Sequence, residues 1–433
     1  MKNVHISPRR LKGNIKAPVS KSDAHRAMIC AALYGNGTFV AADSPSADMA
    51  VTAECLSALG AGVEQKESGY SIDGKIHGGG RLDCGESGST LRFLLPVAAM
   101  TEYETYFTGS GKLPLRPLLP LTEELRRKGA CISGDLLPLT VRGRARGGEY
   151  EMPGDISSQF ISGLLMALPL SGESCSIRLT TPLQSAMYAD MTVNTLSRFG
   201  INWSVVKRND KFPFSGYVLD IATAESTPPA VYLTEGDWSG AAFFAVIGAL
   251  GDKISVSGLD ISSLQPDKKI FDIVREFGAD ADYQNGVMTV QRNAARPFSI
   301  DVSAFPDLFP VLAVLACGAK GKSLLYNASR LKLKESDRIE TTAAFIRALG
   351  GKAQAYGDSL EVYGTGELAG GTADGANDHR IVMSCAAASV ISRGDVTVTG
   401  SDAVKKSYPR FFDDFAACGG KITFSEDKKE RTQ

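Results

Sequence analysis

The densest set of chemically capable side chains lies at residues 330–338, which read Arg-Leu-Lys-Leu-Lys-Glu-Ser-Asp-Arg. An apolar run precedes this stretch and a helical apolar pattern follows it. The stretch is therefore predicted to be a loop that enters a helix, with Ser336 or Asp337 as the N-cap. Backbone N–H groups at such an end favour an anion, and the surrounding cations strengthen that preference. A solvated charged loop explains the same residues, so other parts of the chain have to distinguish the two interpretations.

The elements that must position this stretch repeat along the chain. A helical pattern ending in glycine recurs six times, at Gly60, Gly129, Gly200, Gly278, Gly350 and Gly419. Glycine is the residue that a left-handed helix cap favours. Two β-like runs around a turn follow the first five glycines, which predicts a hairpin in each place. A single strand, 421–425, is predicted after the sixth.

A more apolar helix and then a strand are predicted upstream of each glycine. The predicted helices are 24–33, 91–100, 160–168, 241–250, 310–316 and 381–391, and the predicted strands are 38–41, 105–108, 176–179, 253–256, 323–326 and 395–399. Each unit thus contains a helix, a strand, a loop, a second helix and a hairpin. Six such units predict an α/β fold of two domains with three units each. The Pro228-Pro229 segment, shortly before Glu235, is the predicted boundary.

Composition and charge exclude several classes of protein. The 433 residues carry a net charge of −1, so no global basic field exists to attract nucleic acid or a membrane surface. The eight cysteines are scattered without a closely spaced His or Cys partner, which favours free thiols and argues against a zinc site. The first residues lack the apolar core of a signal peptide, and no apolar run has the length of a membrane span. We therefore expect a cytoplasmic protein without a membrane segment.

The start of the first helix in each unit is unusually polar. Capping alone explains Ser157 and Ser158, and His25 and His379 are expected to be hydrogen-bonding groups rather than catalytic bases. Capping does not explain the cations near these ends, because a cation opposes the positive end of a helix. These cations are Lys21, Arg26, Arg92 and Arg380. If the two domains face each other, as many as six helix N-termini point into one cleft, which predicts a site for a small polyanion.

Five motifs together resemble the 5-enolpyruvylshikimate-3-phosphate synthase family. They are Lys21-Ser22-x-x-x-Arg26, Gly85-x-x-Gly88-Ser-x-x-Arg92, Ser157-Ser158-Gln159, Lys334-Glu335-Ser336-Asp337-Arg338 and Asn377-Asp378-His379-Arg380. The resemblance implies transfer of the enolpyruvyl group of phosphoenolpyruvate to the 5-hydroxyl of shikimate 3-phosphate, with release of phosphate. It also implies an inside-out α/β barrel in each domain and an active site in the interdomain cleft. The expected domains are 20–235, and 1–19 together with 236–425, followed by a polar tail, 426–433.

The resemblance also assigns residues to the two substrates. Shikimate 3-phosphate is expected to contact Lys21, Ser22, Arg26, Ser157, Ser158, Gln159, Ser185, Asp307 and Lys334. Phosphoenolpyruvate is expected to contact Lys21, Gly88, Arg116, Gln159, Arg338, Arg380 and Lys406. Substrates with two phosphates and two carboxylates need several cations, and the arginine fork suits both groups.

The reaction needs one proton delivered to a methylene carbon and one removed from a hydroxyl. We assign Glu335 to the first step and Asp307 to the second, with Lys21 stabilising or sharing the transfer. The resemblance calls for no metal and no organic cofactor, and a monomer is expected.

Two positions depart from the family, and two rival functions stay open. Arg330 stands where many relatives carry Asn, and Glu86 is acidic where relatives are often neutral, which would weaken anion binding unless its side chain is paired or turned away. The nearest rival is UDP-N-acetylglucosamine enolpyruvyl transferase, which typically has Lys-Asn in place of Lys21-Ser22 and usually a Cys in the loop of Arg116. A non-catalytic anion-binding scaffold is the other, but such a scaffold would gain by losing both Glu335 and Asp307.

Overall fold

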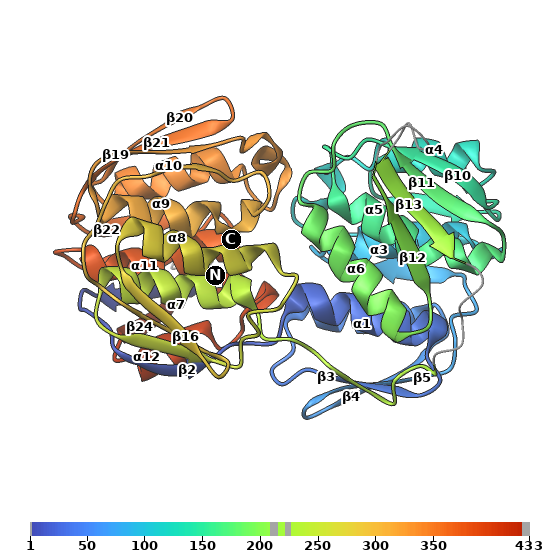
Figure 1. Ribbon diagram of the computed structural model, residues 1–433, viewed down its shortest axis with the longest axis horizontal. Coiled ribbons are helices and arrows are strands. Elements are labelled where there is room, and N and C mark those ends of the chain that lie inside the picture. The colour runs from blue at the N-terminus through green and yellow to red at the C-terminus, as the bar shows by residue number, and fades with distance from the viewer. Residues whose placement is uncertain (1, 208–214, 221–226, 427–433) are drawn as a thin grey trace, which may run out of the picture. The chain divides into compact units, whose positions relative to one another are not determined.

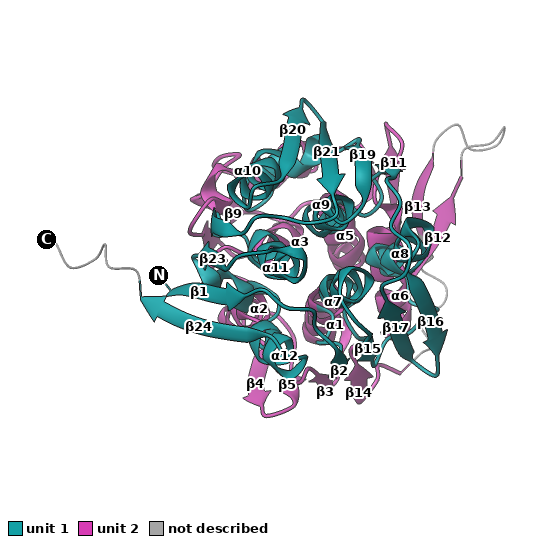
Figure 2. Cartoon of the chain, turned by 90° about the vertical axis from the view of Figure 1, so that its left-hand side faces the viewer, with its two compact units in different colours: residues 1–20, 235–433 teal, residues 21–234 magenta. Residues whose placement is uncertain are grey.

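The computed structural model of the chain describes residues 2–207, 215–220 and 227–426. The predicted polar tail falls on residues 427–433, outside the described ones, apart from Glu426 at the end of the last strand. The chain divides into two compact units (Figure 2): unit 1 comprises residues 1–20 and 235–433, and unit 2 comprises residues 21–234. Each unit is described separately below.

Unit 2 contains three four-stranded sheets, in the orders β14-β3-β5-β4, β6-β7-β9-β8 and β10-β11-β13-β12. Its strands are β3 (Thr38–Ala41), β4 (Gly62–Lys66), β5 (Gly69–Asp73), β6 (Gly80–Asp83), β7 (Thr105–Thr108), β8 (Cys131–Ile132), β9 (Leu139–Arg142), β10 (Gly148–Met152), β11 (Cys175–Leu179), β12 (Asn202–Val206), β13 (Ser215–Asp220) and β14 (Val231–Leu233). Its helices are α1 (Lys21–Tyr34), α2 (Ala47–Ala58), α3 (Gly88–Ala99), α4 (Leu121–Arg127), α5 (Ser158–Ala167) and α6 (Ala186–Arg198), with short 3-10 turns η1 (Leu113–Leu115) and η2 (Leu168–Ser171).

Unit 1 has the same organisation, with sheets β16-β17-β15-β2, β18-β19-β21-β20 and β22-β23-β1-β24. Its strands are β1 (Lys2–Ser7), β2 (Gly13–Lys16), β15 (Ile254–Ser257), β16 (Asp280–Gln284), β17 (Val287–Gln291), β18 (Ser299–Asp301), β19 (Lys320–Tyr326), β20 (Lys352–Tyr356), β21 (Ser359–Thr365), β22 (Gly371–Asp374), β23 (Val396–Thr399) and β24 (Lys421–Glu426). Its helices are α7 (Trp238–Leu250), α8 (Ile270–Phe277), α9 (Phe309–Cys317), α10 (Arg338–Ala348), α11 (His379–Ala388) and α12 (Phe411–Ala417), with 3-10 turns η4 (Pro266–Lys269), η5 (Pro306–Leu308), η6 (Ser329–Leu333), η7 (Ser389–Ile391) and η8 (Ser401–Lys406).

The first helix of each repeat is central, and the sheets lie around it. Nearly every residue of α7, α9 and α11 is buried, as the all-round apolar sequence of these helices requires. Figure 2 looks along these three helices and shows them inside a ring of strands. The second helices lie outside and bury a single stripe; in α8 the stripe is Ile270, Ile273, Val274 and Phe277. This arrangement confirms the predicted inside-out α/β class, and Figure 1 traces the repeats along the chain.

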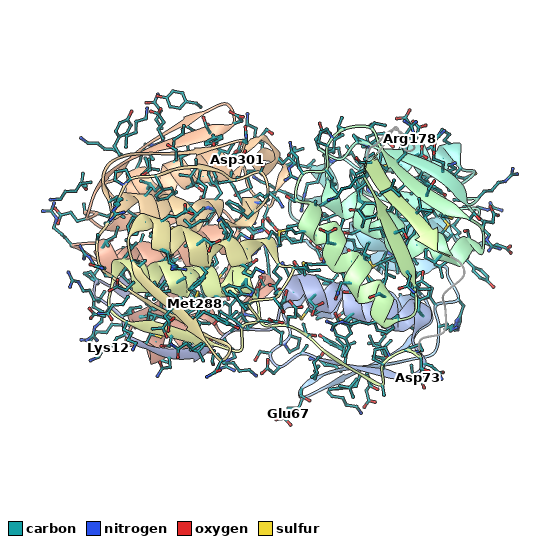
Figure 3. The ribbon with its side chains drawn as sticks, viewed as in Figure 1. Lys12, Glu67, Asp73, Arg178, Met288 and Asp301 are labelled. Carbon is teal, nitrogen blue, oxygen red and sulfur yellow. The ribbon has the colours of Figure 1, made fainter. Side chains whose placement is uncertain are left out.

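Side-chain burial follows the same division. Met288 of β17 is fully buried, whereas Lys12, Glu67 and Asp73 are exposed on the outside of their units (Figure 3). The six glycines that punctuate the repeats all have positive φ, from 80° at Gly350 to 110° at Gly129 and Gly278. The predicted left-handed caps and the five predicted hairpins are confirmed.

Two features of the fold differ from the sequence prediction. All six first helices begin one to three residues earlier than predicted. In α1, α3 and α5 the added residues are polar or glycine and carry no apolar periodicity; α1 begins at Lys21 rather than residue 24. The prediction also lacked the strand before each first helix. In β6, for example, Leu82 is the sole buried residue, so four residues carry almost no periodic signal. This strand pairs in parallel with β7, and α3 is the crossover that a parallel pair requires.

In each unit, some strands that are far apart in the sequence pair within one sheet. Strand β14 pairs in parallel with β3, and β2 pairs in parallel with β15. Strand β1 inserts between β23 and β24, so the first strand of the chain belongs to unit 1, as the family resemblance implies. Where the chain passes between the units, Ser20 N donates to Glu235 O at 2.7 Å, and Val19 forms a bridge with Gly236.

Candidate active site

In unit 2, two arginines converge on the first turn of α3. A Cβ added to Gly88 would lie 2.6 Å from Arg92 Nη1 and 2.8 Å from Arg116 Nη1. Gln159, in the first turn of α5, accepts a hydrogen bond from Arg92 Nη1 at 3.4 Å and donates one to Ser89 Oγ at 2.9 Å. Two guanidinium groups beside a helix N-terminus form a site suited to a phosphate or carboxylate. The structure thus brings together three predicted phosphoenolpyruvate contacts: Gly88, Arg116 and Gln159.

We expect the Gly88→Ala variant to bind phosphoenolpyruvate more weakly, because its methyl group must displace one or both guanidinium ends. Small insertions into a packed site typically cost about 1–3 kcal/mol, so KM for phosphoenolpyruvate should rise about tenfold. Gly134→Ala is the matched control, since its Cβ would meet nothing nearer than Leu136 O at 3.8 Å. Steady-state kinetics with both variants give the comparison. Equal KM values for Gly88→Ala and the wild type would show that the guanidinium ends can move without weakening the binding of phosphoenolpyruvate.

Lys21 is held by a carboxylate that the sequence analysis did not identify. Its Nζ lies 2.7 Å from Oδ2 of Asp48, which is in the first turn of α2. Both side chains are largely buried, at 15% and 14% exposure. The pair places the Lys21 ammonium group beside the N-terminus of α1 and balances the unfavourable helix dipole there.

The Arg26 side chain is buried inside unit 2. Its guanidinium donates to Thr192 Oγ1 at 2.7 Å, to Tyr188 O at 2.9 Å and to Ser162 Oγ at 3.3 Å. Burial is the main reason that its pKa falls to about 10 from the ordinary value of 12.5, with Asp23 opposing the change. These contacts join α1 to α5 and α6, so Arg26 stabilises the helices that carry the site. Its contact with shikimate 3-phosphate stays a prediction.

The serines of unit 2 that are expected to bind shikimate 3-phosphate lie at helix ends, and two of these serines are N-cap residues without a capping hydrogen bond. Ser157 is the N-cap residue of α5, but its side chain makes no capping hydrogen bond, so the capping explanation for this residue is wrong. Ser158 follows in the first turn of α5, and Ser22 in the first turn of α1. Ser185 precedes α6 in the left-handed region, at φ 56° and ψ 43°, and its side chain does not cap the helix. Non-glycine residues in this region are uncommon and gather at ligand sites.

The Glu86 side chain lies against the loop of Gly111. Its carboxylate lies so close to Gly111 that a Cβ there would overlap it. Gly111 adopts φ 57°, a conformation that favours glycine. The acidic side chain therefore packs against the loop that leads to Arg116.

In unit 1, Arg338 is the centre of a group of three carboxylates. It is 1% exposed. Its Nε donates to Asp378 Oδ2 at 2.8 Å, its Nη1 to Asp307 Oδ1 at 2.8 Å, and its Nη2 to Glu335 Oε2 at 2.6 Å. Burial alone would lower the pKa of Arg338, but Asp378, Glu335 and Asp307 raise it above the ordinary value. The guanidinium is therefore charged whenever the protein is folded.

Asp307 is in turn surrounded by three cations. Its Oδ1 lies 2.8 Å from Arg338 Nη1 and 3.5 Å from Lys334 Nζ, and its Oδ2 accepts from Arg380 Nη2 at 3.0 Å. Burial alone would raise the pKa of this carboxyl group, but Arg380, Lys334 and Arg338 outweigh burial and hold the pKa well below its ordinary value. Asp307 is thus ionised at neutral pH, as a proton acceptor must be.

The loops of unit 1 are fixed by contacts to backbone carbonyls. Lys406 Nζ donates to Asn377 O at 2.7 Å, which places it beside the loop that enters α11. Arg330 Nη2 donates to Ser303 O at 2.6 Å, so this unusual residue joins η6 to the segment before η5. Of the two N-caps predicted for α10, Asp337 is correct: its carboxylate accepts from Ile339 N and Glu340 N.

Of the two helix-end histidines, His25 has the hydrogen bond that was expected. His25 Nδ1 lies 2.7 Å from Thr52 Oγ1, and burial holds the pKa of His25 well below the ordinary value, so the ring is neutral.

All eight cysteines are free, and seven of them are buried, with Cys131 exposed. Among the described residues, no cluster of His, Cys, Asp or Glu has the composition of a metal site. None of the helices in that part of the chain combines the length and the apolar character of a membrane span.

Sequence reasoning missed three carboxylates beside the predicted residues: Asp267 and Asp378 are buried, and Asp48 is partly buried. Asp48 holds Lys21, and Asp378 holds Arg338 although it was read merely as part of a motif. Asp267 accepts a hydrogen bond from the Ser239 hydroxyl, and burial raises its pKa to about 7 while Arg380 opposes the rise. Each partner lies 27 to 40 residues away, beyond any local pattern. For Asp378 alone a signal existed, because it occupies an N-cap position.

The chain is similar to known proteins over nearly its whole length. The family model described as EPSP synthase (3-phosphoshikimate 1-carboxyvinyltransferase) matches residues 6–415. A protein of Clostridium kluyveri with the name 3-phosphoshikimate 1-carboxyvinyltransferase is 38% identical over 428 residues, or 98% of each chain. One of the same name from Methanocorpusculum labreanum is 35% identical over 421 residues, covering 96% of this chain and 98% of that one.

Solved structures share the fold. The EPSP synthase from Acinetobacter baumannii matches with a TM-score of 0.80 and 24% identity, covering 98% of this chain and 100% of that one. The enolpyruvyl transferase NikO from Streptomyces tendae matches with a TM-score of 0.76 and 16% identity, covering 98% and 99%. With the family model and the sequence relatives spanning nearly the whole length, the chain belongs to the EPSP synthase (3-phosphoshikimate 1-carboxyvinyltransferase) family.

Proposed function

We propose that the protein transfers the enolpyruvyl group of phosphoenolpyruvate to the 5-hydroxyl of shikimate 3-phosphate, releasing phosphate, in aromatic amino acid biosynthesis. One observation carries the proposal beyond family membership. Asp307 and Glu335, the two groups required for proton transfer, lie among Arg338, Arg380 and Lys334. A scaffold that only trapped anions would bind them more tightly without these carboxylates, because both compete for the same cations.

In this proposal shikimate 3-phosphate is bound by Lys21, Ser22, Arg26, Ser157, Ser158, Gln159 and Ser185 of unit 2 and by Asp307 and Lys334 of unit 1. Phosphoenolpyruvate is bound by Lys21, Gly88, Arg116 and Gln159 of unit 2 and by Arg338, Arg380 and Lys406 of unit 1. The converging guanidinium groups at Gly88 and the ring of cations around Asp307 support this allocation.

The proposed chemistry is an addition followed by an elimination. The 5-hydroxyl oxygen bonds to C2 of phosphoenolpyruvate while Asp307 takes the hydroxyl proton, and Glu335 gives a proton to the methylene carbon. Loss of a proton from the resulting methyl group and loss of phosphate then restore the double bond. Lys21, held by Asp48, stabilises the negative charge of the substrate or shares a proton transfer. No step calls for a metal or an organic cofactor.

We further propose that the chain works as a monomer in the cytoplasm. Eight free thiols, seven of them buried, support a reducing compartment.

Phosphate release is expected to require both substrates together. Omitting either phosphoenolpyruvate or shikimate 3-phosphate should abolish release, because addition to C2 must precede loss of phosphate. A continuous phosphate assay with purified protein makes the measurement. Release with a UDP-N-acetylamino sugar in place of shikimate 3-phosphate would instead assign the chain to the rival transferase, and no release with any pair would support the scaffold.

A further inference from the structure

The guanidinium of Arg338 has two forks, and they are held in different ways. The side fork, Nε with Nη2, binds both oxygens of Asp378, at 2.8 Å and 3.2 Å. The end fork, Nη1 with Nη2, binds two separate carboxylates, Asp307 at 2.8 Å and Glu335 at 2.6 Å. The first arrangement is the bidentate geometry that orients an arginine most firmly.

Asp378 is built into the structure, whereas the end-fork partners are accessible. The Asp378 side chain is fully buried, and those of Asp307 and Glu335 are 19% and 18% exposed. Asp378 also accepts from Ser336 Oγ at 3.0 Å, and as the N-cap of α11 it accepts from Arg380 N at 2.9 Å. The Asp378 carboxylate therefore accepts hydrogen bonds from the side chain of Arg338 and from the backbone N–H of Arg380.

A buried carboxylate with this many donors stays in place when a ligand arrives. Displacing it would leave several buried donors without an acceptor, which is costly. The end fork is different, because an incoming carboxylate or phosphate can span Nη1 and Nη2 with two of its own oxygens. Such a ligand would replace Asp307 and Glu335 at the arginine and release both for proton transfer.

We propose that Asp378 is the positioning residue of the anion site, holding Arg338 by its side fork while the end fork exchanges Asp307 and Glu335 for an anionic group of the substrate. This inference rests on the proposed function, because it takes phosphoenolpyruvate as the ligand. The exchange couples substrate binding to the freeing of the acid and the base. It also explains why Arg338 has three carboxylate partners when one would neutralise it.

Kinetics of Asp378 variants separate this role from helix capping. In Asp378→Asn, the introduced side-chain oxygen would still cap α11, but the amide cannot accept from both Arg338 nitrogens. KM for phosphoenolpyruvate should rise about 30-fold or more in this variant, as loss of a charged buried hydrogen bond implies, with a smaller change in kcat. Asp378→Ala should show a similar rise. If capping were the whole role, Asp378→Asn would behave as the wild type and Asp378→Ala alone would be impaired.

Asp337→Asn is the matched control, because Asp337 caps α10 and makes no described contact with an arginine. Its KM should stay within about twofold of the wild type. Should Asp378→Asn fail to fold, Ser336→Ala removes one donor to Asp378 without changing charge, and it should raise the same KM about threefold. An unchanged KM in Asp378→Asn, or in Ser336→Ala where Asp378→Asn does not fold, would overturn the proposal.

Arginine-selective nitrogen NMR on the wild type provides a test that does not depend on turnover. The Arg338 Nε–H signal, assigned by its absence in Arg338→Lys, should exchange slowly with water, both alone and after addition of phosphoenolpyruvate with shikimate 3-phosphate. Loss of that slow exchange on adding the substrates would mean that Asp378 is displaced, which would overturn the proposal. If phosphate release fails but the signal is slow, the enolpyruvyl transfer is wrong while Asp378 still positions Arg338.

Discussion

Replacing Glu335 by Gln should reduce kcat by about 10²- to 10⁴-fold, the usual contribution of a positioned acid or base, and leave substrate binding nearly intact. The side-chain oxygen of the introduced glutamine can still accept the hydrogen bond that Glu335 Oε2 takes from Arg338 Nη2 at 2.6 Å. The neutral amide has no proton to give to the methylene carbon. Steady-state kinetics should therefore show a collapse of kcat with KM for phosphoenolpyruvate within about threefold of the wild type.

Glu340→Gln is the appropriate control for the lost charge. Glu340 lies in the first turn of α10, five residues after Glu335, and is exposed, so its replacement removes the same charge near this helix end. Its kcat should stay close to that of the wild type. A kcat for Glu335→Gln within about twofold of the wild type would remove Glu335 from the acid role and leave it as an arginine partner.

The sequence was sufficient for the architecture because the architecture is local and repeated. Helix periodicity, a glycine cap and a hairpin recur in each copy, and each is a pattern within about a dozen residues. The missed strands are those whose place depends on a distant partner. Strand β14 has a single buried residue and is defined by its pairing with β3, far earlier in the chain. No local feature of so short a strand predicts such a pairing.

The candidate site divides in the same way. The cations stand out because they violate a local rule, since Lys21 and Arg380 lie at the positive ends of helices. Their counter-ions do not stand out, because a carboxylate in a first turn is ordinary. Asp48 and Asp378 obey the helix rule and were therefore not recognised as counter-ions, although they hold Lys21 and Arg338. Position within a helix therefore revealed half of each ion pair, and the tertiary structure revealed the other half.

Arg26 illustrates a further limit of the sequence. A motif identifies which residues recur with a function, but it does not distinguish a residue that touches substrate from one that supports those that do. The contacts of Arg26 with α5 and α6 are made over more than 130 residues of sequence separation. Burial and hydrogen-bond partners are needed to recognise such a supporting role.

Replacing Asp307 by Asn should also reduce kcat by about 10²- to 10⁴-fold, but with a different effect on binding. The variant loses the acceptor for the hydroxyl proton, and it also removes a carboxylate that competes with substrate for Arg338, Arg380 and Lys334. KM for phosphoenolpyruvate should therefore stay unchanged or fall. A raised KM with an unchanged kcat would assign Asp307 to substrate binding alone.

The stability of Asp307→Asn should depend on pH in a direction set by the pKa of the wild-type carboxyl group. Arg380, Lys334 and Arg338 hold that pKa well below its ordinary value against the opposing effect of burial. An unfolded aspartate has a pKa of about 3.9, so the ionised Asp307 stabilises the folded protein above about pH 4. This contribution is lost as pH falls through the depressed folded pKa.

In urea unfolding, the free energy of unfolding of Asp307→Asn should consequently fall furthest below that of the wild type at about pH 7. The difference should be smaller near about pH 3. Asp301→Asn is a suitable control, because Asp301 lies in the same unit at the end of β18 and bonds to Ser303 N and Asn327 rather than to a cation. The free energy of unfolding of Asp301→Asn should differ little from that of the wild type at neutral pH. If the Asp307→Asn gap were the same at both pH values, the three cations would not be what holds this carboxylate ionised, and the charge balance that we derive for the centre of unit 1 would be wrong.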